Sequence, residues 1–163
     1  MSDTSGLFWD QRSPWQKYVT GEYATNHPFR RYITEHREVY WDSGNVLGSW
    51  NLLDSTSYYS RLQGAGVLFN RGTAIELSNR AKLLGQNLPE CGSGKYSNEE
   101  FQSKCVPNQT TVRKVCSNEP RLDAMIFSFE IKGLHAVRWT FEQPDPTQNK
   151  AYFLYPCSIF RKS

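Results

Sequence analysis

Alternation of apolar and polar side chains in the last third of the chain is the feature that most constrains its fold. Every second residue is large and apolar from 125 to 131, and the same period runs from 135 to 141 and, after a Pro144-Asp145-Pro146 turn, from 153 to 159. A period of two is typical of strands that bury one face. The pattern predicts three strands, whose inward residues are Met125, Phe127, Phe129 and Ile131; His135, Val137, Trp139 and Phe141; and Phe153, Tyr155, Cys157 and Ile159.

The first two of these strands are expected to pair as a hairpin. A loop of three residues, 132–134, keeps one face of the pair apolar throughout, whereas a two-residue turn sets apolar residues against polar ones. The preferred register places Phe129 opposite Val137 and Phe127 opposite Trp139.

Two capping boxes predict helices between the N-terminal region and these strands. Thr73-x-x-Glu76 precedes apolar residues at helical spacing, and Gly85 follows where a left-handed C-terminal cap is favoured. A helix is therefore expected at about 73–84. A second box, Ser97-x-x-Glu100, predicts a shorter helical segment that ends near Lys104.

The remaining secondary-structure signals are less regular. Apolar residues between 45 and 54 suggest a strand, in which Gly48 marks a bulge or a close approach of two backbones. Residues 30–40 fit a helix or a strand equally well. Pro156 lacks the amide hydrogen that a central strand needs, so the last strand is expected at a sheet edge or bulged there.

Together these signals predict an α+β fold. It consists of an antiparallel β-sheet of about five strands, or a partly open barrel, with one main helix at about 73–84. The expected organisation is an irregular, aromatic-rich N-terminal arm at 1–44 and a single domain at 45–163, with a cysteine-containing loop at about 88–115. A length of 163 residues agrees with one domain.

Charge and hydropathy exclude some classes of function. The net charge is +3 with the basic residues spread along the chain, so no nucleic-acid partner is predicted. Mean hydropathy is −0.65 and no long apolar run occurs, so no membrane span is predicted. The first residues do not resemble a secretory signal, and a soluble protein of the cytoplasm or an organelle is expected.

The four cysteines lie far apart and form no Cys-x-x-Cys pair, so no metal site is predicted. Disulfides would constrain the Gly- and Ser-rich segment that holds three of them, and four cysteines allow three pairings. Asn108-Gln109-Thr110 matches the acceptor triplet for N-linked glycans.

Large rings are concentrated in the irregular N-terminal arm. Tryptophan and tyrosine are typical anchors of protein interfaces, so the arm is predicted to dock on a partner protein within a larger assembly. The alternative is that these rings complete the domain's own core. The predicted partner-binding residues are Trp9, Trp15, Tyr18, Phe29, Tyr32 and Trp41.

Gly48-Ser49-Trp50-Asn51-Leu52-Leu53 resembles the Gly-x-Trp opening strand of the calycins, the group of lipocalins and fatty-acid-binding proteins. The following segment, 58–71, is similar to the helical lid of fatty-acid-binding proteins, and Arg161 resembles the terminal arginine that in this group lies across the tryptophan. The resemblance implies an antiparallel barrel around an apolar ligand, closed by Trp50 and Arg161, and no catalytic residue.

These observations favour a non-catalytic binding protein, an accessory or interaction subunit of a larger assembly. The first alternative is a carrier of an apolar small molecule such as a lipid or pigment, and the second is an enzyme of unknown reaction. No cofactor is predicted. The residues expected to bind the apolar ligand are Trp50, Phe127, Phe129, Val137, Trp139, Phe153 and Arg161.

An anion site is a further hypothesis. The N-terminus of the helix predicted from Thr73, with Arg71 beside it, has free amides and a favourable dipole. The alternative is that Arg71 is a surface residue without a ligand.

No catalytic residue is assigned, because histidines are few. His135 is expected to be a core or rim residue, and Glu35, His36 and Glu38 are expected to be solvated.

Overall fold

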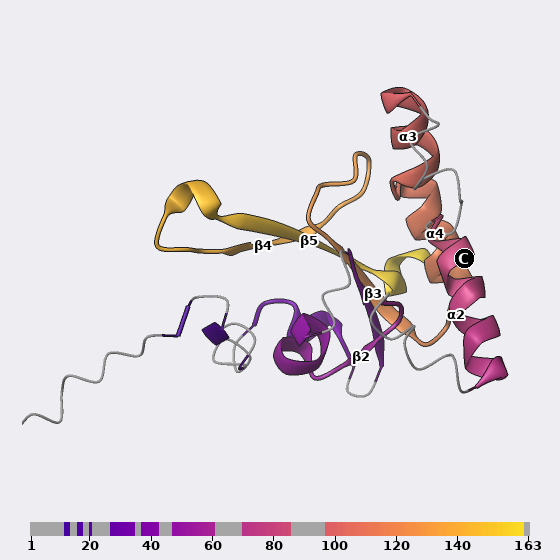
Figure 1. Cartoon of the computed structure of the whole chain (residues 1–163), viewed down its shortest axis with the longest axis horizontal. Coiled ribbons are helices and arrows are strands. Elements are labelled where there is room, and N and C mark those ends of the chain that lie inside the picture. The colour runs from indigo at the N-terminus through magenta and orange to yellow at the C-terminus, as the bar shows by residue number, and fades with distance from the viewer. Residues whose placement is uncertain are drawn as a thin grey trace, which may run out of the picture.

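A five-stranded mixed sheet forms the centre of the computed structural model, which describes residues 12–13, 16–17, 20, 27–34, 37–42, 47–60, 70–85 and 97–161 (Figure 1). The strands are β1 (Glu38–Trp41), β2 (Thr56–Ser57), β3 (Leu122–Phe127), β4 (Val137–Phe141) and β5 (Lys150–Pro156). Their order in the sheet is β2-β1-β3-β5-β4.

Strand direction changes within this sheet. β1 is parallel to both β2 and β3, whereas β5 is antiparallel to β3 and β4. The predicted α+β class is confirmed, but an antiparallel sheet is correct only for β3, β5 and β4, and the sheet does not close into a barrel. Parallel pairing of β1 with β3 requires a long crossover, and the helices between β2 and β3 supply it.

The predicted hairpin of the first two alternating segments is wrong. β5 lies between β3 and β4, so Phe127 pairs with Phe153 and Val137 pairs with Leu154. The reason is burial: β5 has buried side chains on both faces, Leu154 and Tyr155, and so fits a central position, whereas β4 exposes Arg138 at the edge.

The prediction that Pro156 marks an edge strand is also wrong. Pro156 is the last residue of β5 and stands opposite Ala124, at the point where the ladder with β3 ends. Its missing amide hydrogen therefore interrupts no continuing ladder. The chain then turns into the 3₁₀ segment η7 (Cys157–Phe160), so Ile159 is exposed rather than part of a strand.

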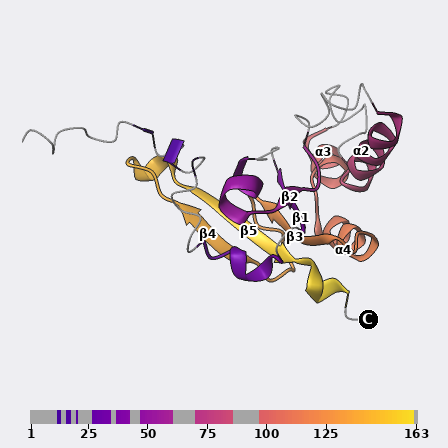
Figure 2. The same ribbon diagram turned by 90° about the horizontal axis from the view of Figure 1, so that it is seen from below.

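In the described part of the chain, three α-helices of eight or more residues, rather than one main helix, accompany the sheet: α2 (Arg71–Leu83), α3 (Asn98–Cys105) and α4 (Gln109–Asn118). α3 agrees with the short helical segment predicted from Ser97, whereas α4 forms where the predicted loop at about 88–115 is expected to continue. Figures 1 and 2 show the three helices gathered at one side of the molecule, with the β4–β5 hairpin extending away from them.

The ends of the helices show which of the predicted caps form. The capping box of Ser97 and Glu100 is confirmed at α3, and Gly85 adopts the expected left-handed conformation, with a φ of 71°. The predicted box at Thr73 is wrong, because Asn70 caps α2 and its side chain accepts a hydrogen bond from the Thr73 amide at 3.2 Å. Asn108 caps α4 in the same way.

The strand predicted at 45–54 is wrong. Residues 48–52 form a single helical turn, the π-helical segment η3 (Gly48–Leu52). The buried pair Gly48 and Ser49 recurs four positions later as Leu52 and Leu53, which is the period of a helix face rather than of a strand. Trp50 points to solvent from this turn and is 48% exposed.

The two faces of the sheet bury separate apolar clusters. The first joins the sheet to α2 and α4, and its members include Tyr40, Met125, Phe127 and Tyr155. The second joins the opposite face to η3 and to the segment around Phe29. Neighbouring strand residues such as Met125 and Ile126 belong to different clusters, because successive side chains point to opposite faces.

A disulfide fastens α4 to the end of β5. Cys116 and Cys157 are fully buried in the first cluster and are joined across 41 residues. Cys105, at the end of α3, is disulfide-bonded as well. No described cysteine is a free thiol.

Candidate functional site

The residues predicted to line an apolar pocket do not meet in one place. Phe127, Phe129 and Phe153 belong to the first cluster, whereas Val137 and Trp139 pack against the second, on the other face of the sheet. Trp50 is exposed on η3, and Arg161 binds the C-terminal end of α4. The five residues in the clusters thus pack into two separate cores instead of surrounding one cavity.

The arm residues are divided as well. Phe29 and Trp41 are fully buried in the second cluster, and Trp41 lies in β1, inside the sheet. For these two rings, the alternative that they complete the domain's own core is correct. Tyr32 is half-buried. Trp9, Trp15 and Tyr18 lie outside the described residues.

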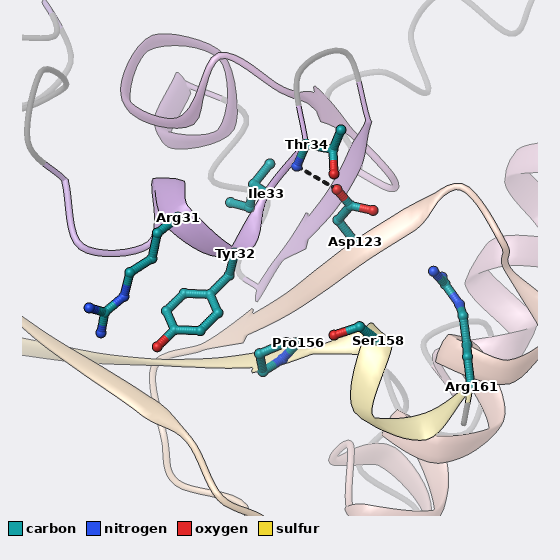
Figure 3. Close-up of a pocket in the computed structure, with 8 residues that line it drawn as sticks. All are labelled: Arg31, Tyr32, Ile33, Thr34, Asp123, Pro156, Ser158 and Arg161. Atoms are coloured by element: carbon teal, nitrogen blue, oxygen red, sulfur yellow. Dashed lines mark hydrogen bonds between the residues drawn. The ribbon is translucent and has the colours of Figure 1, made fainter. Parts of the chain in front are cut away.

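One pocket brings together Tyr32 and Arg161, which the sequence analysis assigned to different sites (Figure 3). It has a volume of about 300 Å³ and lies where the segment before β1 passes the end of β5. Its lining consists of Arg31, Tyr32, Ile33, Thr34, Asp123, Pro156, Ser158 and Arg161. Besides Tyr32, five of these eight residues have a charged group or a hydroxyl group, so the lining is mainly polar.

Arg31 and Tyr32 form one side of this pocket. Both belong to the 3₁₀ turn η1 (Arg30–Tyr32), and the Arg31 guanidinium lies 4.9 Å from the centre of the Tyr32 ring, a cation–π contact. Among the described residues, neither the guanidinium of Arg31 nor the hydroxyl of Tyr32 has an ion-pair or hydrogen-bond partner. Both groups are therefore available to a ligand.

Asp123 is the acidic residue of the pocket, and its charge is already balanced. Its carboxylate accepts hydrogen bonds from the Thr34 amide at 2.6 Å and from Nε of Arg37 at 3.2 Å. Arg37 in turn donates from Nη2 to the carbonyl of Pro120 at 2.8 Å. These contacts hold the segment before β1 against β3, and they leave the positive charges of the pocket unopposed.

Ser158 and Arg161 form the opposite side. Arg161 donates from Nε to the carbonyl of Cys116 at 3.0 Å, and from Nη2 to the carbonyls of Glu119 and Leu122. The bonds to Cys116 and Glu119 satisfy carbonyls at the end of α4, and the bond to Leu122 reaches the first residue of β3. Within the described part of the chain, Nη1 of Arg161 and the Ser158 hydroxyl make no hydrogen bond.

The lining of this pocket is rich in hydrogen-bond donors. No histidine or cysteine is among its lining residues, whereas two arginines and three hydroxyl-bearing residues are. Arginine presents a planar fork of donors that matches a carboxylate or phosphate. Figure 3 shows Arg31 and Arg161 at opposite ends of the pocket, so an extended acidic ligand fits better than a small anion.

The sequence predicted only two of the eight lining residues, Tyr32 and Arg161, as site residues and missed the other six, for a physical reason. The pocket is assembled from residues 31–34, Asp123 and residues 156–161, which are distant in the sequence. No short motif connects them. The one usable signal is the adjacent Arg31 and Tyr32, since both residue types are common anchors of interfaces.

The histidines form no catalytic group in the described residues. His27 is buried beside Trp139 and Phe29, with ring centres at 4.3 Å and 5.1 Å, and burial, helped by the charge of Arg30, lowers its pKa to about 4. His135 is exposed in the loop before β4, contrary to the expected core or rim position. His36 lies outside the described residues.

Glu38 is buried rather than solvated. Its carboxylate forms an ion pair with Arg80, whose Nη2 is 2.9 Å from Oε1. Glu35 lies outside the described residues.

At the proposed anion site, Arg71 is exposed at the first position of α2, but the Thr73 amide is already bound to the Asn70 side chain. Fewer free amides therefore face a ligand there than the sequence suggests.

No group of three or more His, Cys, Asp or Glu side chains in the part of the chain that the structure describes is arranged to hold a metal ion. Nor does any helix there combine the length and the apolar character that crossing a membrane requires.

Comparison of the chain with known proteins identified no relative. No protein-family model matches the chain, and neither a curated protein nor a solved structure matches it. A proposal about function therefore depends on the geometry of the site.

Proposed function

We propose that this protein is a non-catalytic binding protein, and that it engages an acidic segment of a partner protein through the pocket of Arg31, Tyr32, Ser158 and Arg161. The proposal depends on one observation: several hydrogen-bond donors that line this pocket have no partner among the described residues. The Arg31 guanidinium, the Tyr32 hydroxyl and Nη1 of Arg161 are unpaired among the described residues, although Arg161 is partly buried.

Charge supports an acidic partner. The pocket has two arginines, and the carboxylate of Asp123 is paired with Arg37 outside the lining. An acidic side chain would gain charge-assisted hydrogen bonds there, which are stronger than neutral ones. Arginine and tyrosine are also the residue types that contribute most at protein interfaces.

Size supports an inserted segment of a protein. A volume of about 300 Å³ is at the small end for pockets that enclose a whole ligand, and it accommodates one or two side chains. An apolar carrier has less support, because the apolar residues predicted for it, such as Phe127 and Trp139, face different cores.

The test is affinity capture with quantitative mass spectrometry, using the full chain as bait. We expect Arg31→Ala and Tyr32→Phe to reduce capture of the same proteins, about tenfold for the arginine, since a central arginine contributes more than about 1 kcal/mol. Tyr32→Phe keeps the ring packed against the second cluster and removes the hydroxyl alone. Capture should weaken as salt rises.

Arg138→Ala is the matched control, because Arg138 is an exposed arginine on β4 and is not part of the pocket. Proteins retained by the wild type and by Arg138→Ala, but lost with Arg31→Ala, support the proposal. Equal capture by all three baits contradicts it.

A further inference from the structure

The triplet Asn108-Gln109-Thr110 lies at the N-terminus of α4, on the surface of the protein. Asn108 is the N-cap residue, and both Asn108 and Thr110 are exposed. It is the sole Asn-x-Ser/Thr triplet in the 163-residue sequence. The proposed binding function makes no use of it.

The hydrogen bonds of Asn108 leave its amide nitrogen free. Oδ1 accepts from the Thr111 amide at 3.1 Å and from the Thr111 hydroxyl at 3.3 Å. Among the described residues, Nδ2 has no hydrogen-bond partner. Because a glycan attaches to this nitrogen and the oxygen stays in place, the cap of α4 survives the modification.

A hollow beside Asn108 offers space for a sugar. It has a volume of about 350 Å³ and is lined by residues 106–110 and 129–132. Phe129 is half-buried there, and Glu130 and Lys132 are exposed. An apolar ring next to charged groups suits a pyranose, whose ring face is weakly polar and whose hydroxyls donate and accept hydrogen bonds.

The disulfides point to the compartment in which such a modification takes place. Cys116 is joined to Cys157, and Cys105 is also disulfide-bonded. Disulfides form and persist in oxidising compartments such as the endoplasmic reticulum lumen and are rare in the cytosol. The lumen is also where asparagine-linked glycans are added to secreted chains.

From these four observations we propose that Asn108 is an N-glycosylation site, and that the first sugar packs in the hollow between Asn108 and residues 129–132. The donor is a lipid-diphosphate-linked oligosaccharide. Nδ2 forms a bond to the anomeric carbon of the sugar while the bond from that carbon to the phosphate oxygen breaks. The lipid diphosphate leaves with the electron pair, and one amide proton passes to a base of the transferase.

The experiment uses the full chain, secreted from eukaryotic cells behind a cleavable signal, and measures the intact mass before and after enzymatic removal of N-glycans. We expect one glycan on the wild-type chain. Thr110→Ala should abolish it without altering the Asn108 cap, whereas Thr110→Ser should retain it, since serine also completes the acceptor triplet. A secreted wild-type chain with the mass of the bare polypeptide overturns the proposal, as does a glycan that persists in Thr110→Ala.

Hydrogen exchange tests the position of the sugar. We expect amides at 130–132 to exchange more slowly in the glycosylated chain than in the same chain after glycan removal, because the sugar shields them. Equal exchange rates in the two samples overturn the packing in the hollow. Thr110→Ala, compared with the deglycosylated wild type, should melt at the same temperature, and this shows that the variant is folded.

Discussion

Nη2 of Arg80 lies 2.9 Å from Oε1 of Glu38 and so joins α2 to β1 across 42 residues of sequence. The Glu38 side chain is 9% exposed and the Arg80 side chain 14%. The same guanidinium donates from Nη1 to the carbonyl of Tyr58 at 2.7 Å and lies 4.5 Å from the centre of the Tyr58 ring. One arginine thus connects α2 to both β1 and the segment after β2.

Loss of Arg80 should therefore destabilise the fold through Glu38. Arg80→Met leaves a buried carboxylate without its partner, and we expect the free energy of unfolding to fall by about 3 kcal/mol in urea titrations followed by circular dichroism. The control is Glu76→Gln, because Glu76 contacts the same arginine at 2.6 Å but is 61% exposed. Its loss should cost less than about 1 kcal/mol. Similar effects of the two variants would contradict this account.

The disulfide between Cys116 and Cys157 should stabilise the fold mainly by constraining the unfolded chain. For a closed loop of about 40 residues, the chain-entropy relation gives about 4 kcal/mol. We expect the double variant Cys116→Ala/Cys157→Ala to lose a similar amount in denaturant titrations under oxidising conditions. An unchanged midpoint in that variant would show that the cross-link adds nothing to stability.

Stability should fall as the pH drops from about 6.5 to 4 because of His27. Burial lowers the pKa of the folded imidazole to about 4, whereas the unfolded imidazole titrates near 6.5. Between these values the unfolded state binds the extra proton, so unfolding is favoured, by up to about 3 kcal/mol at the acid end. Thermal melts of His27→Gln should show a flatter dependence on pH. Parallel pH profiles for the two proteins would contradict the assignment.

The start of α2 offers a test of its cap. We expect Asn70→Ala to lower the free energy of unfolding by about 1 kcal/mol, since the Asn70 side chain accepts the hydrogen bond of the Thr73 amide. Asn70→Asp should preserve the cap. The comparison variant is Thr73→Ala, which leaves this backbone donor intact and should cost less. A larger loss for Thr73→Ala than for Asn70→Ala would restore the cap predicted from the sequence.

Local signals were reliable where residues a few positions apart complete them, or where one residue type alone favours the conformation. Ser97 and Glu100 bond each other's backbone, and Gly85 adopts a conformation that other residues avoid. At α2 the box predicted at Thr73 overlooks Asn70, whose side chain is also of a capping type. The backbone of Asn70 is extended and Arg71 is already helical, so Asn70 is the cap.

The candidate site was accessible to sequence reasoning only in fragments. The sequence singles out Tyr32 and Arg161 but assigns them to separate functions, and the structure places both in the lining of one pocket. Their place in one pocket depends on the bond from the Thr34 amide to Asp123, which spans 89 residues. Nothing near either residue in the chain encodes that contact.

The sequence alone determines the α+β class, because the period of two at 125–141 and the helix caps act between residues a few positions apart. Tertiary structure decides the rest. The alternation of apolar and polar residues assigns each side chain to a face of the sheet, but it does not determine which strands pair with each other. β5 lies between β3 and β4 because it buries residues on both faces. Burial is a property of the assembled chain, so the order of the strands, and with it the pocket, depends on contacts between distant segments.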